Sequence, residues 1–249
     1  MAKNQVATQS SNAVATTDDQ LPDFMKKGAT RGAENVGNED VIIPRIELVQ
    51  SLSPARKKTD PGYIEGCEEG HLFNNVTREL YGPEVEVVPV YYAKQFLVWK
   101  DRKQGGGTNG FRGAFASPEL AQKAIAELGE EGLDVVDTAQ HFVLVKHEGK
   151  WQEAVVSMSK SKFKVSKRWN SLIRLTNADS FAKRYRLYSV TETNANNESY
   201  YNFGVSGLGF VDKETYERAE KLYEAVSRGA VKVNTDFEGV VDAEPAAEY

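Results

Sequence analysis

Two stretches of alternating apolar and polar residues, each folded back by turn residues, limit the possible fold most strongly. Residues 141–145 and 151–158 are joined by a Glu-Gly-Lys turn, and residues 181–191 and 200–205 are joined by an asparagine-rich turn. Such alternation favours strands with one buried face, and short polar turns join antiparallel neighbours. The sequence therefore predicts two β-hairpins and an antiparallel sheet at the centre of the fold.

Further strands are expected in the first half of the chain. Residues 84–92 alternate strongly, and a second apolar run covers residues 95–100. We interpret these as two strands of a sheet that is buried on parts of both faces. Residues 41–49 form another extended element, and Pro44 within it is typical of an edge position because proline lacks an N–H donor.

Three segments have the period of amphipathic helices. Residues 117–128 carry the clearest signals, because Ser117 is a typical N-cap and Gly129 ends the pattern. Residues 159–175 and 213–227 repeat apolar residues every three or four positions. Together with the hairpins, these segments predict an α+β fold: an antiparallel β-barrel or sheet of the OB type, elaborated with about three helices.

Composition divides the chain of 249 residues into three parts. Residues 1–38 are polar and show no sustained apolar period, so we expect them to be disordered. Residues 39–233 hold the predicted strands and helices and are expected to form a single domain. Residues 234–249 are expected to be a disordered acidic tail. Its acidic and aromatic residues are Asp236, Phe237, Glu238, Asp242, Glu244, Glu248 and Tyr249.

Basic residues are concentrated in one part of this acidic protein. Segment 160–186 contains nine lysines and arginines and one acid, Asp179, whereas the whole chain has a net charge of −5. Such polarisation favours a polyanionic partner, and the aromatic residues among the cations suit unstacked bases. The alternative is a solvated surface helix followed by an ordinary strand, and the sequence leaves both open.

A helical projection of residues 159–175 separates the cations from an apolar stripe. The stripe consists of Val165, Trp169, Leu172 and Ile173. Phe163 falls on the opposite side among the cations, where an exposed ring suits stacking on a base. Ser159 is the expected N-cap, and a different helix start would turn Phe163 inward instead.

From these patterns we predict sequence-independent binding of a single-stranded nucleic acid, which the resemblance described below identifies as single-stranded DNA. The residues expected to neutralise phosphates are Lys100, Arg102, Lys103, Arg112, Lys160, Lys164, Lys167, Arg168, Arg174, Arg184 and Arg186. The residues expected to stack on bases are Phe163, Tyr188 and Tyr201, together with Trp99. The glycine-rich loop after Trp99 is interpreted as a mobile basic arm, although a long exposed hairpin without a ligand explains it at least as well.

The inventory of reactive side chains argues against an enzyme. The chain has one cysteine and three histidines, too few for a zinc finger, and it has no nucleotide-hydrolysis or common hydrolase motif. His141 and His147 flank an apolar run and are expected on the exposed face of a strand. We expect no metal and no cofactor. The polar N-terminus and the lack of a long apolar run predict a cytoplasmic protein without a membrane partner.

The predicted fold and the acidic tail that ends in an aromatic residue resemble the single-stranded-DNA-binding proteins of bacteriophages. The resemblance implies that residues 236–249 cover the DNA site when it is empty and recruit replication or recombination proteins when they are released. It also implies the host cytoplasm as the location. Two alternatives remain open: a recombination mediator that anneals strands, and an interaction or virion structural protein without a nucleic-acid ligand. Self-association into a homo-oligomer is open as well.

Overall fold

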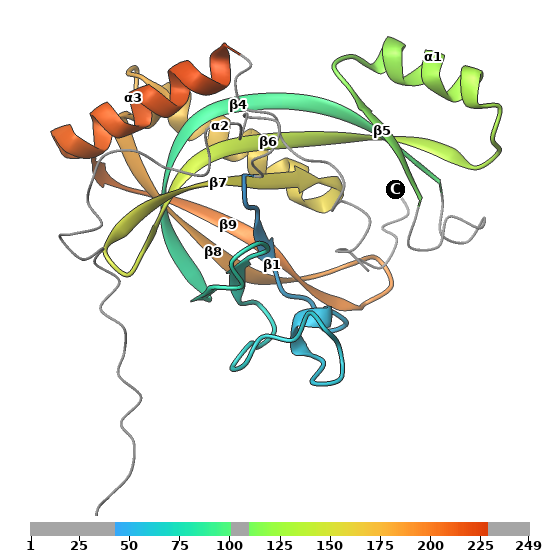
Figure 1. Ribbon diagram of the computed structural model, residues 1–249, viewed down its shortest axis with the longest axis horizontal. Helices are drawn as coiled ribbons and strands as arrows, with labels where there is room; N and C mark the ends of the chain where they lie inside the picture. The colour runs from blue at the N-terminus through green and yellow to red at the C-terminus, as the bar shows by residue number, and fades with distance from the viewer. Residues whose placement is uncertain (1–42, 101–109, 229–249) are drawn as a thin grey trace, which may run out of the picture. The chain divides into compact units, whose positions relative to one another are not determined.

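Figure 1 shows a computed structural model of the protein, which describes residues 43–100 and 110–228. The predictions of disorder for residues 1–38 and 234–249 lie outside the described residues. The same holds for most of the glycine-rich loop and for two of the predicted phosphate contacts, Arg102 and Lys103.

A six-stranded antiparallel sheet is the centre of the fold. The strands lie in the order β7–β6–β4–β8–β9, and β5 pairs with the second half of β4. Their bounds are β4 (Glu84–Lys100), β5 (Phe111–Phe115), β6 (Leu133–His147), β7 (Lys150–Ser159), β8 (Lys183–Thr193) and β9 (Ser199–Phe210). β7 and β9 are its edges, so within the described residues the sheet is open and does not close into a barrel.

Both predicted hairpins are present. β6 and β7 pair from Thr138 to His147, and β8 and β9 pair from Lys183 to Thr193. The first hairpin turns at Gly149, whose φ of +79° lies in the left-handed region that glycine adopts without strain.

The prediction of two separate strands over 84–92 and 95–100 is wrong, because β4 is a single strand of 17 residues. Neither Ala93 nor Lys94 breaks a strand, and β6 pairs with β4 along its whole second half. A bulge beside Pro89 shifts the register, which agrees with the absence of an N–H at that residue.

A smaller antiparallel sheet precedes the main one. It consists of β1 (Ile46–Leu48), β2 (Leu72–Asn74) and β3 (Leu80–Gly82), so only part of the extended element expected at 41–49 is strand. Just before β1, the Val155 N–H of edge strand β7 donates to the Pro44 carbonyl at 2.8 Å. Pro44 therefore lies at an edge, as its missing donor predicts.

The three predicted α-helices are present as α1 (Pro118–Leu128), α2 (Phe163–Leu175) and α3 (Lys213–Ser227). Figure 1 shows α1 and α3 at opposite ends of the long strands β4 and β6. Ser117 caps α1 as expected, because its Oγ accepts from the Leu120 N–H at 3.3 Å. Ser159 does not cap α2. A 3₁₀ turn over Lys160–Lys162 comes first, the side chain of Ser159 makes no cap hydrogen bond, and the α-helix begins only at Phe163.

Apolar side chains are buried on both faces of the main sheet. The α2 face holds a cluster that includes Val87, Val143, Val165, Trp169, Tyr185 and Leu187. The α3 face holds a second cluster that includes Val88, Val90, Phe142, Leu144, Ala219 and Leu222. The α+β prediction is therefore confirmed, with helices packed on an antiparallel sheet. None of the described helices is both long enough and apolar enough to span a membrane.

Candidate nucleic-acid interface

The inner face of α2 is fixed to the sheet by an aromatic and polar contact. Trp169 is fully buried, and its ring stacks on His141 of β6 with the ring centroids 4.5 Å apart. One turn earlier, Ser166 Oγ lies 2.8 Å from His141 Nε2. These contacts hold one side of the helix against the sheet, so the opposite side faces solvent.

His141 differs from its prediction, because it is only 1% exposed. Val143 and Val145 follow it on the same side of β6 and are buried with it, which explains why this histidine is in the core. Burial lowers the pKa of His141 to about 3, so the ring is neutral at physiological pH. His147, at the end of the same strand, is half-buried beside the ring of Tyr81.

The outer face of α2 carries a row of cations, which we call the α2 cationic surface. It consists of Lys160 in the preceding 3₁₀ turn and of Lys164, Lys167, Arg168 and Arg174 in the helix. All five are exposed. Only Lys164 has an acidic partner among the described residues, namely Glu192 at 2.8 Å. The predicted separation of cations from the apolar stripe is confirmed.

Phe163 lies at the start of this surface between two ammonium groups. Lys167 Nζ is 5.2 Å from the centre of the ring and Lys94 Nζ is 5.3 Å from it, both within the range of cation–π attraction. The ring is half-buried and also contacts the apolar cluster beneath α2. Phe163 is therefore neither fully exposed nor part of the core. Its ring presents a partly exposed aromatic face between two ammonium groups.

Lys94 was not among the predicted site residues. It lies on β4, its Nζ is also 4.7 Å from the Phe96 ring centre, and it pairs with Asp137 at 2.6 Å. Its distance from α2 along the chain hides this contact, because only the packing of the helix on the sheet brings the two together. The strand therefore adds a sixth cation to the edge of the α2 cationic surface.

Glu192 ties the start of α2 to the β8–β9 hairpin. Its Oε2 accepts hydrogen bonds from Lys164 (2.8 Å), from the Tyr200 hydroxyl (2.7 Å) and from the Asn202 amide (2.9 Å). Burial raises the pKa of this carboxyl, but the three hydrogen bonds outweigh that effect, and the pKa lies below its usual value. The ionised carboxylate is thus stabilised where it positions Lys164.

Three predicted contacts on β8 lie on the opposite face of the sheet. Tyr185 and Leu187 point toward α2, so alternation places Arg184, Arg186 and Tyr188 on the α3 side. Arg184 pairs with Glu86 at 2.8 Å, and Arg186 pairs with Glu84 at 3.6 Å. The whole basic block therefore does not lie on one face of the sheet, because one strand cannot present these residues and the α2 cations on the same side. Contact of Arg184, Arg186 and Tyr188 with DNA stays a prediction.

Tyr188 is half-buried and packs against its neighbours rather than standing free. The Arg186 guanidinium lies 5.6 Å from its ring centre, and the ring covers the backbone of Gly204. A Cβ added at Gly204 would lie 2.5 Å from the ring, which shows how closely the two strands approach there.

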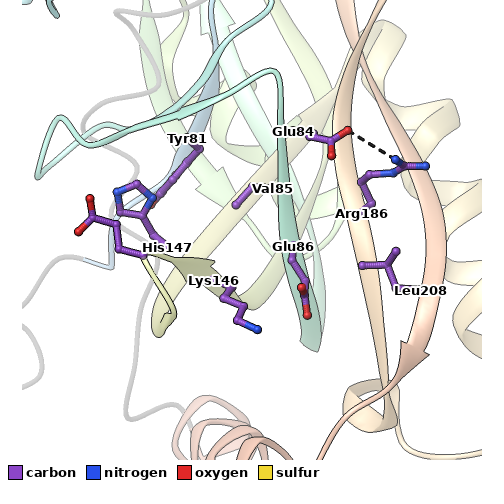
Figure 2. Close-up of a pocket in the computed structure, with 9 residues that line it drawn as sticks. Tyr81, Glu84, Val85, Glu86, Lys146, His147, Arg186 and Leu208 are labelled. Atoms are coloured by element: carbon purple, nitrogen blue, oxygen red, sulfur yellow. Dashed lines mark ion pairs between the residues drawn. The ribbon is translucent and has the colours of Figure 1, made fainter.

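A shallow hollow of about 370 Å³ on this opposite face is lined by both acidic and basic side chains. Figure 2 shows Glu84, Glu86, Lys146 and Arg186 around it, with the Glu84–Arg186 ion pair as a dashed line. Since the acids and bases lie side by side, the hollow has no strong excess of positive charge to attract a phosphate chain. We therefore do not place the nucleic-acid contact there.

The predicted contacts at the far end of β4 are also paired. Lys100 and Arg112 both bind Glu130, at 3.3 Å and 2.9 Å. The hydrogen bond from Arg112 is the main reason that the pKa of Glu130 is lowered. Trp99 packs on Phe111 with ring centroids 5.2 Å apart. Lys100 is six residues along β4 from Lys94, which is about 20 Å in a strand.

Tyr201 supports the small sheet rather than an exposed surface. Its ring covers Gly70, where an added Cβ would come within 2.6 Å of the ring. Its backbone N–H and carbonyl both bind the side-chain amide of Gln50, at 2.9 Å and 2.7 Å. The ring of Tyr201 is thus half-buried and packed on the protein, and its stacking on a base stays a prediction.

No three His, Cys, Asp or Glu side chains in the described parts of the chain are grouped so that they could hold a metal ion. The arrangement of α2 suits binding to an extended anion. It presents cations, one framed ring and no acid between Ser159 and Thr176.

Comparison with known proteins gives one match. Residues 11–232 match the family of Pam3 phage gp34-like proteins, whereas no curated protein and no solved structure matches the chain. The relationship to bacteriophage proteins is thereby confirmed, and single-stranded-DNA binding stays a prediction. Because the match covers most of the sequence, including all the described strands and helices, this chain belongs to the Pam3 phage gp34-like protein family.

Proposed function

We propose that this protein binds single-stranded DNA without sequence preference, and that the α2 cationic surface is the contact. One observation carries the proposal: the Phe163 ring lies between the ammonium groups of Lys94 and Lys167 at the start of a row of exposed cations. Single-stranded nucleic acid is bound by this combination, in which cations follow the phosphates and an aromatic face receives a base.

The row of cations has the extent and charge for several phosphates. From Lys164 to Arg174 it spans ten residues of helix, or about 15 Å along the axis. Lys167, Arg168 and Arg174 have no acidic partner among the described residues, so a phosphate does not have to displace a carboxylate there. Lys94 and Lys164 would exchange Asp137 and Glu192 for phosphate and contribute less.

Phe163 would supply the stacking surface. Stacking of a base on an aromatic side chain contributes about 1–3 kcal/mol and tolerates any base, because every base has a flat face. The flanking ammonium groups would hold the adjacent phosphates while the base covers the exposed part of the ring. Arg184, Arg186, Tyr188 and Tyr201 have no part in this surface, because of the face on which they lie or the packing of their rings.

The acidic tail would compete with DNA for this surface. From Asp236 to the end the chain carries five acids and no base, whereas α2 and its preceding turn carry six bases and no acid. Opposite charges on one chain meet at high effective concentration, so the tail would occupy the empty surface and be released by DNA. The released tail would then be available to replication or recombination proteins. Deletion of residues 236–249 should strengthen DNA binding.

A salt titration tests the proposal. The change in anisotropy of a fluorescent oligo-dT would be measured with the full chain at several salt concentrations. Three to five engaged cations predict a slope of log affinity against log salt of about −2 to −3.5 for a single strand. Between 50 and 200 mM salt the affinity should therefore fall about 20- to 130-fold. An oligonucleotide that does not bind even at the lowest salt would refute the proposal.

A matched pair of variants tests the role of the ring. Phe163→Leu keeps an apolar side chain against the core but removes the flat face, so it should weaken oligo-dT binding about 5- to 100-fold. Leu175→Ala removes a side chain that is 81% exposed on the same helix and should leave binding unchanged. Equal affinities of the Phe163→Leu variant and the wild type would exclude Phe163 as the stacking residue.

A further inference from the structure

The outer side of β9 is blocked at one end and open in the middle. At Tyr201 the side-chain amide of Gln50 takes both backbone hydrogen-bonding positions, as a neighbouring strand would. Backbone groups of alternate residues point the same way, so those of Phe203, Val205 and Gly207 also point outward. The Phe203 N–H donates to the side-chain Oδ1 of the preceding residue, Asn202, at 2.8 Å.

Val205 and Gly207 have no such partner within the described residues. β8 lies on the inner side of β9, and no other described strand pairs with β9. Beyond Gly207 the register of β9 against β8 shifts, since Gly207 lies opposite Tyr185 and Phe210 lies opposite Lys183. This bulge ends the regular run, so the open part of the edge extends from the Phe203 carbonyl to Gly207.

β9 lacks the features that normally protect an edge strand. Lysines, other charges and prolines usually prevent edges from pairing with other chains. The twelve residues of β9 include no charged residue and no proline, and they end with exposed apolar side chains at Leu208 (43% exposed) and Phe210 (69% exposed). The other edge strand, β7, carries Lys150 and Glu153 and is bridged by the segment before β1.

We propose that β9 pairs antiparallel with β9 of a second copy of this chain, about a two-fold axis at Val205. Phe203 of each copy then lies opposite Gly207 of the other, and the outward N–H and carbonyl groups of Val205 bind those of the second copy. A strand that pairs with itself brings like charges together wherever it carries any. Because β9 carries no charged residue, it can pair with β9 of a second copy without charge repulsion. The Gln50 amide at Tyr201 and the bulge after Gly207 bound the open part of the edge, so the pairing is centred on Val205.

The pairing would join the two main sheets and keep both α2 helices on one side. Two identical antiparallel strands within one sheet are related by an axis perpendicular to that sheet, so equivalent faces point the same way. α2 is close to this edge, because the Asn202 amide donates to the Ser161 carbonyl at 3.4 Å and the Lys162 ammonium lies 5.8 Å from the Phe203 ring centre. If the proposed function holds, one DNA strand could follow both α2 cationic surfaces. The pairing itself does not depend on DNA.

Two variants at one position test the pairing without DNA. Gly207→Pro removes the outward N–H and places a ring at the edge, while the bonds between β8 and β9 remain, since proline is tolerated on edge strands. Gly207→Ala adds a Cβ but keeps the N–H, so it is the matched control. An added Cβ meets only the flexible end of Lys183, at 3.2 Å.

Sedimentation equilibrium of the full chain should show a reversible monomer–dimer equilibrium in the wild type and in Gly207→Ala. Gly207→Pro should weaken dimerisation at least about tenfold, because two backbone hydrogen bonds per dimer are lost and the ring separates the strands. Circular dichroism would show that each variant is folded. A wild type that is monomeric at every concentration, or a proline variant that dimerises like the wild type, would overturn the inference.

Hydrogen exchange provides a second readout that needs no variant. The Val205 and Gly207 amides should exchange fast in dilute protein and more slowly as the concentration rises, whereas the amides between β8 and β9 should not change. Exchange at Val205 that does not depend on concentration would also overturn the inference. Because neither experiment contains DNA, its outcome is separate from that of the salt titration.

Discussion

Replacing His141 with glutamine should make the protein less sensitive to mild acid. The imidazole is fully buried, and the rings of Trp169 and Tyr92 and the Ser166 hydroxyl surround it. Burial lowers its pKa from 6.5 to about 3. Between these values the unfolded chain binds a proton that the folded protein does not, so the free energy of unfolding falls as the pH falls.

The expected size follows from the two pKa values. For a group with a pKa of about 6.5 in the unfolded chain and about 3 in the folded protein, the loss between pH 7 and pH 5 is about 2 kcal/mol. The His141→Gln variant lacks this group but keeps the carboxylates that also titrate in acid. The wild type should therefore lose about 2 kcal/mol more than the variant over this range.

Urea unfolding at pH 7 and pH 5, followed by circular dichroism, measures the difference. The control is Ser166→Ala, which removes the hydrogen bond at 2.8 Å but leaves the imidazole buried. This variant should be less stable than the wild type at pH 7 by about 1 kcal/mol and should keep the wild-type pH dependence. Equal losses in the wild type and in His141→Gln would refute the description of His141 as a buried neutral side chain.

Two further substitutions test contacts of the β8–β9 hairpin, the first with the start of α2 and the second with the small sheet. Glu192→Gln removes the charge that accepts three hydrogen bonds and should lower the free energy of unfolding by about 1–3 kcal/mol, as measured in urea, whereas Glu148→Gln in an exposed turn should have little effect. Gly70→Ala should destabilise the protein by about 1–3 kcal/mol more than Gly149→Ala in thermal unfolding. Both glycines have nearly the same positive φ, but only the new Cβ at Gly70 meets the Tyr201 ring, so equal effects would contradict the close packing described there.

The elements with local signals could be predicted from the sequence. α1 is marked by Ser117 at its start and Gly129 at its end, and both residues form the caps that their chemistry favours. The bounds of α3 agree with its apolar period, and both hairpins agree with their alternation and turn residues. In each case the residues that determine the structure lie within a few positions of one another.

The details of the candidate interface depended on contacts between distant segments. Alternation correctly separates Arg186 from Tyr185 on β8, but it does not tell which side of the sheet α2 covers. The framing of Phe163 by Lys94 joins residues that are 69 positions apart, so no local pattern contains it. His141 did have a signal, because both sides of its strand are apolar and a polar residue there is more often buried than exposed.

Two double variants that each remove two positive charges test whether DNA binds to the α2 face of the sheet. Lys167→Gln with Arg168→Gln changes the α2 cationic surface, and Arg184→Gln with Arg186→Gln changes the opposite face. Both variants alter the net charge equally, so a difference between them reports the location of the contact. The measurement is the affinity for oligo-dT as a function of salt.

The α2 variant should bind more weakly, and its salt slope should be smaller in magnitude by about 1.4, because two cations no longer release counterions. The variant on the opposite face should keep the wild-type affinity and slope. Equal loss of affinity in both variants, or a larger loss in the Arg184 and Arg186 variant, would contradict the claim.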